Sequence, residues 1–135
     1  MKSNKLRAVQ LFVLAISAVV TIWAMLRAAD WQMDFAGLAL ICLAISPYVV
    51  LYAVGVLLEK YTSLPRVALV SCVVAVLMLA FTLLAYIGTL GDTSSTYALI
   101  FIFVPINLYI GGFALLVIGL LAAWLIARLA TKTSD

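Results

Sequence analysis

Residues 59–90 read EKYTSLPR followed by VALVSCVVAVLMLAFTLLAYIGTL, and this stretch decides the fold. A short loop with the basic residues Lys60 and Arg66 leads directly into 24 residues that carry no charge. At a rise of about 1.5 Å per residue, such a run forms a helix long enough to cross the hydrocarbon core of a bilayer, which is about 30 Å thick. The stretch therefore predicts a transmembrane helix that follows a basic loop.

Three more charge-free stretches give the chain the same character throughout. The 135 residues are 68% hydrophobic and 10% charged, whereas soluble domains carry about 25% charged residues. The sequence predicts spanning helices over about 8–26, 35–58, 67–90 and 97–127. Because water does not tolerate so much apolar surface, we expect an all-α integral membrane protein. The short loops predict an antiparallel four-helix transmembrane bundle that forms a single domain over 1–135.

The basic residues are divided unevenly between the two ends of the predicted helices. With both termini in the cytoplasm, the loops at 27–34 and 91–96 lie outside, and Arg27 is the one basic residue on that side. The other seven lie inside: Lys2, Lys5, Arg7, Lys60, Arg66, Arg128 and Lys132. Since short loops follow the positive-inside rule, we expect the N-terminus and the C-terminus to be cytoplasmic.

The sequence lacks the residues that several classes of function require. The chain has no histidine, no Cys-x-x-Cys pair and no phosphate-binding, hydrolase or metalloprotease motif. None of the four predicted spans contains Asp, Glu, Lys or Arg, whereas ion-coupled transporters usually place an ionisable residue within the bilayer. We expect a protein that is not an enzyme, with no catalytic residue, no cofactor, no metal ligand and no nucleic-acid partner. The two cysteines, Cys42 and Cys72, fall at different depths, so we expect them to stay unpaired.

Polar residues enter the predicted spans at helical spacing and at similar depth. Most form pairs four positions apart, so that both members share a helix face. One hypothesis is a small polar pocket that opens toward the outer leaflet, lined by Ser17, Thr21, Ser46, Thr82, Tyr86 and Asn107. The alternative is ordinary packing between helices, in which Ser and Thr hydroxyls bond to their own backbone.

Two features predict how the helices deform and approach one another. Pro47 lies in the middle of a span and frees the carbonyl of Leu43, so we expect a kink there and a neighbour that satisfies this carbonyl. The last span is rich in small residues, and Gly112 and Gly119 lie seven positions apart on one face. Small residues let helices approach closely, so this candidate packing face should meet the bundle interior or a partner protein.

The sequence leaves two function classes open. The stretch SSTYALIFIFVPINLY, at 94–109, resembles a segment of small bacterial membrane proteins, and this resemblance implies no function. We expect a multi-pass protein of the cell membrane, namely of a bacterial inner membrane. The first hypothesis for its function is that the protein is an accessory subunit, a regulator or a toxin-immunity protein. In this role it packs in the lipid bilayer against another membrane protein or a second copy of itself. The alternative is a small transporter or channel for an uncharged or amphipathic solute.

Overall fold

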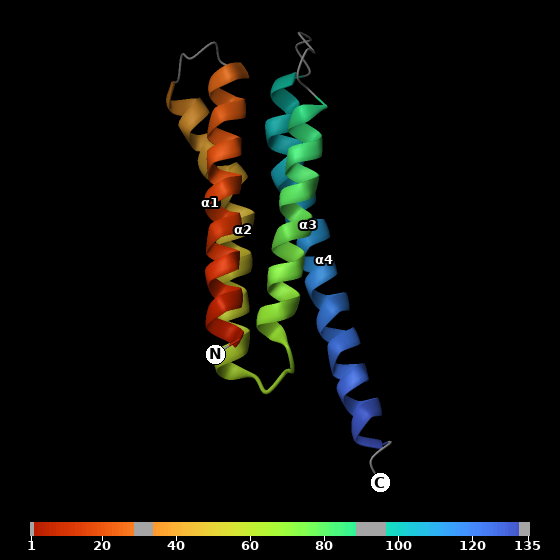
Figure 1. Ribbon diagram of the computed structural model, residues 1–135. Helices are drawn as coiled ribbons and strands as arrows, with labels where there is room; N and C mark the ends of the chain where they lie inside the picture. The colour runs from red at the N-terminus through yellow and green to blue at the C-terminus, as the bar shows by residue number, and fades with distance from the viewer. Residues whose placement is uncertain (1, 29–33, 89–96, 133–135) are drawn as a thin grey trace.

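Four long helices make up the regular structure of the part of the chain that the structure describes (Figure 1). The computed structural model describes residues 2–28, 34–88 and 97–132. The helices are α1 (Lys2–Ala28), α2 (Phe35–Tyr61), α3 (Val67–Ile87) and α4 (Tyr97–Lys132). Each is long and apolar enough to cross a membrane, which confirms the four predicted helices. Most of the two loops predicted to lie outside falls at residues 29–33 and 89–96, which are outside the described residues.

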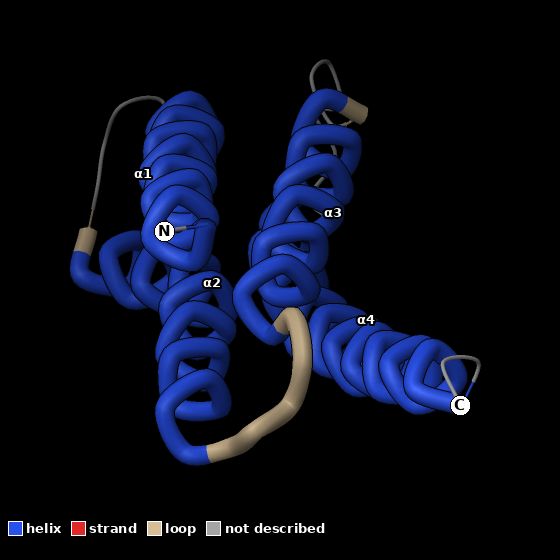
Figure 2. The backbone as a smooth tube through the Cα atoms, turned by 60° about the horizontal axis from the view of Figure 1, so that its bottom comes forward, coloured by secondary structure: helices blue, strands red, loops and turns tan. Residues whose placement is uncertain are grey.

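The helices lie side by side, with α4 leaning away from the other three toward its C-terminal end (Figures 1 and 2). The N-terminus and the loop at 62–66, which joins α2 to α3, lie at the same end of the molecule. α1 packs mainly against α3, and α2 packs mainly against α4, whereas α1 and α4 barely touch. The core is a cluster of buried apolar side chains to which all four helices contribute, among them Val13, Leu51, Met78 and Leu116.

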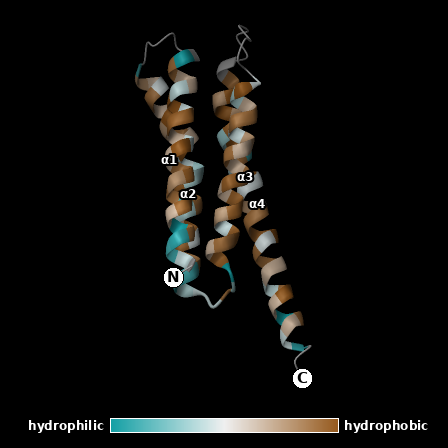
Figure 3. Ribbon diagram, in the orientation of Figure 1, coloured by the Kyte–Doolittle hydropathy of each residue, from teal (hydrophilic) through white to brown (hydrophobic). Residues whose placement is uncertain are grey.

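The outside of the molecule is apolar between two more hydrophilic ends (Figure 3). Large apolar side chains point outward on every helix, such as Phe12 on α1, Val49 on α2, Leu84 on α3 and Ile110 on α4. In water such a surface would favour aggregation, whereas lipid tails cover it without a comparable penalty. The distribution is compatible with a multi-pass membrane protein.

Three helix ends differ from the ends that the sequence predicts, and two of the helices extend into polar residues. α1 begins at Lys2 rather than near Ala8, because Ser3 and Arg7 of its first turns form hydrogen bonds with Glu59 of α2. α4 continues to Lys132, five residues past the predicted end, through turns that carry Arg128 and Lys132. α3 is shorter than predicted, since it ends at Ile87 with Gly88 as its C-cap.

Capping residues position the starts of α2 and α3. Asp34 is the N-cap of α2, and its Oδ1 accepts a hydrogen bond from the Gly37 amide at 2.8 Å. Arg66 precedes α3 with a φ of 60°, in the left-handed region that non-glycine residues rarely adopt. This conformation turns the chain from the 62–66 loop into α3.

Candidate functional site

The proline inside α2 is supported by a neighbouring hydroxyl. Pro47 has no N–H to donate to the carbonyl of Leu43, and the Ser46 hydroxyl donates to that carbonyl instead, at 2.7 Å. The Tyr109 hydroxyl of α4 in turn donates to Ser46 Oγ, also at 2.7 Å. Figure 2 shows that the first turns of α2 run in a different direction from its last turns. Ser46 therefore satisfies the freed carbonyl and links the bent segment to α4.

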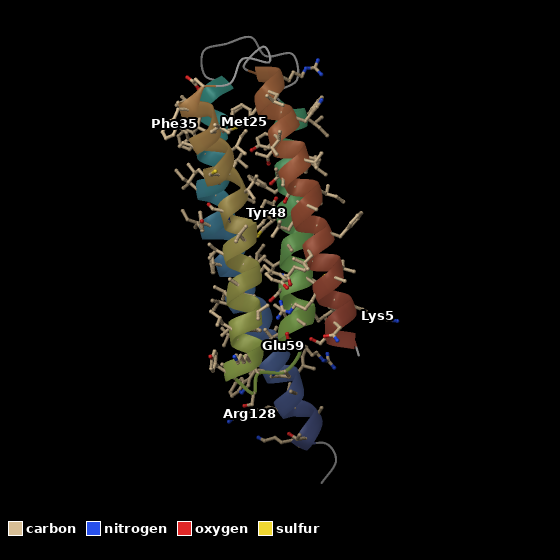
Figure 4. All side chains as sticks on the ribbon, turned by 90° about the vertical axis from the view of Figure 1, so that its left-hand side faces the viewer. Lys5, Met25, Phe35, Tyr48, Glu59 and Arg128 are labelled. Carbon is tan, nitrogen blue, oxygen red and sulfur yellow. The ribbon has the colours of Figure 1, made fainter. Side chains whose placement is uncertain are left out.

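A second hydrogen bond links α2 to α3 in the buried centre of the molecule, where Figure 4 labels Tyr48. The Tyr48 hydroxyl lies 2.6 Å from Thr82 Oγ1, and both side chains are almost completely buried. Thr82 also donates to the carbonyl of Met78, at 2.9 Å, within its own helix. If that bond takes the Thr82 proton, Tyr48 is the donor of the interhelical bond, because each hydroxyl has one proton.

The two residues that α1 contributes to the predicted pocket are buried within the bundle. Ser17 and Thr21 are both buried, at 0% and 1% exposed. Ser17 donates to the carbonyl of Leu14 at 2.7 Å, which is the local bonding expected for a hydroxyl within a helix. Thr21 Oγ1 makes no hydrogen bond with any of the described residues. α1 therefore contributes two buried hydroxyls to the interior, and neither bonds to another helix within the described residues.

The remaining two residues of the predicted pocket lie in different surroundings. Tyr86 of α3 is buried, with its ring 5.3 Å from that of Phe101 on α4. Asn107 is exposed, and its amide donates to the carbonyl of Phe103 one turn back, at 2.8 Å. It lies on a groove between α3 and α4 of about 280 Å³, whose other lining residues include Phe81 and Leu115. The structure thus brings together Ser46 with Tyr109 and Thr82 with Tyr48, and a shared pocket for all six residues stays a prediction.

The glycine face of α4 packs within the chain. A Cβ atom added to Gly112 would lie 2.8 Å from the sulfur of Met78, and one added to Gly119 would lie 2.7 Å from Cγ1 of Val70. Both neighbours belong to α3. Of the two surfaces that the sequence allowed for this face, the bundle interior is the one that it meets. A Cβ on Gly111, one residue before Gly112, would meet nothing within 4 Å.

Sequence reasoning missed a polar cluster where α1, α2 and α3 meet. Arg7 donates to Glu59 Oε2 from Nη2 at 2.7 Å and from Nε at 3.0 Å, and its Nη1 donates to Gln10 at 2.8 Å. Its guanidinium also lies 5.8 Å from the centre of the Tyr52 ring. Only 12% of the Arg7 side chain is exposed. The spacing of Arg7 and Gln10 on one helix face was the available signal, and the hydropathy boundary at residue 8 concealed it.

The absence of a side chain at Gly55 makes room for this cluster. A Cβ atom at that position would lie 2.9 Å from Arg7 Nη1 and 2.7 Å from the hydroxyl of Ser71 on α3. Ser71 and Gln10 are buried, and Ser71 Oγ and Gln10 Nε2 make no hydrogen bond with the described residues. Gly55 therefore lets the arginine enter between three helices, beside buried polar atoms on two of them.

A groove of about 730 Å³ opens next to the cluster, at the end of the molecule where Figure 4 labels Lys5 and Glu59. One part of its lining is polar, with Ser3, Lys5, Glu59 and Arg66. The rest is apolar, with Leu6, Leu64, Val67, Ala68 and Leu69. The groove thus joins basic side chains to an apolar wall formed by the start of α3.

The described residues contain no group of three or more His, Cys, Asp or Glu side chains that could hold a metal ion. Cys42 is exposed on α2, Cys72 is buried on α3, and both thiols are free. The chain matches no protein-family model, no curated protein and no solved structure.

Proposed function

We propose that the chain is a non-enzymatic membrane protein that acts by packing against another membrane protein, as an accessory subunit, a regulator or a toxin-immunity protein. In this proposal the four helices form an antiparallel transmembrane bundle in the cell membrane, with both termini in the cytoplasm. The sequence supports this topology through the position of its basic residues, and the absence of histidine and catalytic motifs supports a non-enzymatic role.

The observation that carries the proposal is the uncovered C-terminal half of α4. In an 18-residue apolar stretch of α4, 17% of the residues are buried, against 44% in the corresponding stretch of α3. Beyond Leu116 the one buried residue among those described is Ala123. The exposed side chains of this half are large and apolar: Val117, Ile118, Leu121, Leu125, Ile126 and Leu129.

The length of α4 makes this surface difficult to cover with lipid alone. Its 36 residues correspond to a helix of about 54 Å, whereas the hydrocarbon core is about 30 Å thick. Figure 1 shows that its C-terminal turns extend past the ends of the other helices. A steep tilt would keep these turns in lipid, and a partner helix would cover them in an upright orientation.

An apolar groove beside this half of α4 offers a seat for a partner side chain. It has a volume of about 320 Å³ and lies between Leu64 of the 62–66 loop and residues Val117, Leu120, Leu121 and Trp124 of α4. The glycine face of α4 is occupied by α3, so the opposite, bulky face is the one that a partner would contact. Van der Waals packing of apolar side chains is one of the interactions that hold transmembrane helices together.

Site-specific photocrosslinking in the producing cells tests the proposal. A benzophenone amino acid at Ile118 or Leu125 should give a crosslinked band that contains a second membrane protein. The same probe at Val19 of α1, which is 67% exposed against 62% for Ile118, is the matched control and should give no such band. Equal crosslinking at all three positions, or crosslinking to lipid alone, would contradict the proposal, and a band of two identical chains would identify the partner as a second copy.

The alternative function, a conduit for an uncharged or amphipathic solute, is favoured by the groove that Asn107 lines between α3 and α4. The side-chain amide of Asn107 is the polar group that a solute hydroxyl would contact in this groove. Flux through liposomes that contain only the purified chain, and its loss in Asn107→Leu, would establish the conduit and displace the accessory role. Ile106→Leu, a neighbouring exposed position, is the control.

A further inference from the structure

The groove at the N-terminal end of α1 has the composition of a site for an amphiphile with an anionic head. Its lining includes the basic Lys5 and Arg66 together with the apolar Leu64, Val67 and Leu69. Its volume of about 730 Å³ lies within the range of about 300–1,000 Å³ that is typical of small-molecule sites. The lining therefore combines basic and apolar side chains in one groove.

The charges of the cluster leave this groove positive. The carboxylate of Glu59, which also lines the groove, is already held by two hydrogen bonds from Arg7 and one from Ser3. Lys5 and Arg66 form no ion pair with any of the described residues. Because Arg7 offsets the charge of Glu59, the two free basic side chains determine the sign of the potential in the groove.

The position of the groove points to a lipid rather than to a soluble ligand. It lies at the end of the molecule that carries the N-terminus and the 62–66 loop, where charged residues give way to the apolar helices (Figure 3). In a membrane-inserted chain, this transition is the level of the lipid phosphates. Basic pockets between transmembrane helices at the cytoplasmic surface bind anionic headgroups.

We propose that this groove binds one anionic phospholipid, with its phosphate held by Lys5 and Arg66 and its acyl chains lying along Leu64, Val67 and Leu69. The apolar wall gives a reason for an attached acyl chain, which a free phosphate lacks. The proposal requires the chain to be in a membrane, and it does not depend on a partner protein at α4.

Native mass spectrometry of the full chain in mild detergent tests the headgroup. Phosphatidylglycerol should remain bound in one copy at concentrations where phosphatidylcholine does not. Lys5→Gln and Arg66→Gln should each lower the affinity for phosphatidylglycerol by about fivefold. Lys60→Gln removes the same charge from a side chain that lies over the Tyr61 ring and does not line the groove, so it should leave the affinity unchanged.

Three results would overturn the proposal. An equal loss in Lys60→Gln would show diffuse attraction rather than a site, and equal retention of phosphatidylcholine would show that the headgroup is not selected. Displacement of the lipid by inorganic phosphate at similar concentration would show an anion site without a lipid. Circular dichroism of each variant reports whether it folds. If Arg66→Gln does not fold, Lys5→Gln alone tests the role of the charge, because Lys5 is exposed.

A second pair of variants tests the apolar wall without changing any charge. Leu69 is 43% exposed and lines the groove, whereas Val73, one turn further along α3, is 50% exposed and does not. Leu69→Trp should fill the groove and reduce retention of phosphatidylglycerol, and Val73→Trp should not. Equal retention of phosphatidylglycerol by the two variants would show that the acyl chain does not lie along Leu69 and would contradict the proposal.

Discussion

Arg7 and Glu59 tie the first turns of α1 to the last turns of α2 through two hydrogen bonds to one carboxylate oxygen, at 2.7 and 3.0 Å. The ion pair is asymmetric, since 12% of the Arg7 side chain is exposed and 37% of the Glu59 side chain. The residue that lies deeper in the protein is thus the cation, and Gln10 and Tyr52 complete its surroundings.

Loss of this ion pair should destabilise the fold moderately. We expect Glu59→Gln to lower the free energy of unfolding by about 1–2 kcal/mol, between the typical values for exposed and for buried pairs, because it leaves the Arg7 charge without a counterion. Unfolding in mixed micelles with increasing denaturing detergent measures this change. Lys60→Gln, one residue away, is the control and should change stability little. An equal effect of both variants would contradict the role of the pair.

The Tyr48–Thr82 hydrogen bond should be more sensitive to loss of the threonine than of the tyrosine hydroxyl. Tyr48→Phe leaves Thr82 bonded to Met78, so we expect a cost near 0.6 kcal/mol, the average for bonds between transmembrane helices. Thr82→Val leaves a buried tyrosine hydroxyl without this partner and should cost more. The double variant should cost less than the sum of the two. Unfolding free energies of the three variants decide this, and a larger effect of Tyr48→Phe would show that the contact is misassigned.

The glycines of α4 should respond to added methyl groups according to what faces them. Gly119→Ala should destabilise more than Gly112→Ala, because the branched Val70 gives way less easily than the flexible end of Met78. Gly111→Ala meets open space and should stabilise the helix by up to about 1 kcal/mol. Thermal unfolding in detergent gives the order. If Gly111→Ala were the most damaging, a surface absent from the single chain would have to cover that position.

The support of Pro47 by Ser46 predicts a dependence between the two positions. Ser46→Ala should lower the free energy of unfolding by about 1 kcal/mol, because it leaves the Leu43 carbonyl without its donor and removes the acceptor of the Tyr109 hydroxyl. In a Pro47→Ala background the new amide N–H can donate to Leu43, so the same change should cost less. A double-mutant cycle on unfolding free energies measures the difference. Identical costs in both backgrounds would show that Ser46 acts through Tyr109 alone.

Topology is the prediction that rests most directly on sequence. Seven basic residues at one end against Arg27 at the other should place both termini in the cytoplasm. A reporter that is active in the cytoplasm should be active when fused after Lys132 and inactive when fused within 91–96. Adding two lysines to the 91–96 loop should weaken this preference. Activity of the 91–96 fusion in the cytoplasm would reverse the assignment.

Hydropathy predicted the number of helices and their central residues, because crossing lipid is a local requirement on about 20 consecutive side chains. The start of α1 at Lys2 was not predictable in this way, since its polar first turns are held by Glu59, far away in sequence. The N-cap role of Asp34 was predictable, because a cap involves residues three positions apart.

The polar contacts inside the bundle could not be predicted from the sequence in this way, because each joins residues of two different helices. Spacing alone placed Ser46 and Thr82 on helix faces, and their partners Tyr109 and Tyr48 come from other helices. A transmembrane helix that is apolar on all sides carries no periodic signal of which face meets protein and which meets lipid. The rotation of each helix about its axis, and with it these hydrogen bonds and the groove beside Arg7, is therefore decided by close packing such as that of Gly55 and Gly119 in the tertiary structure.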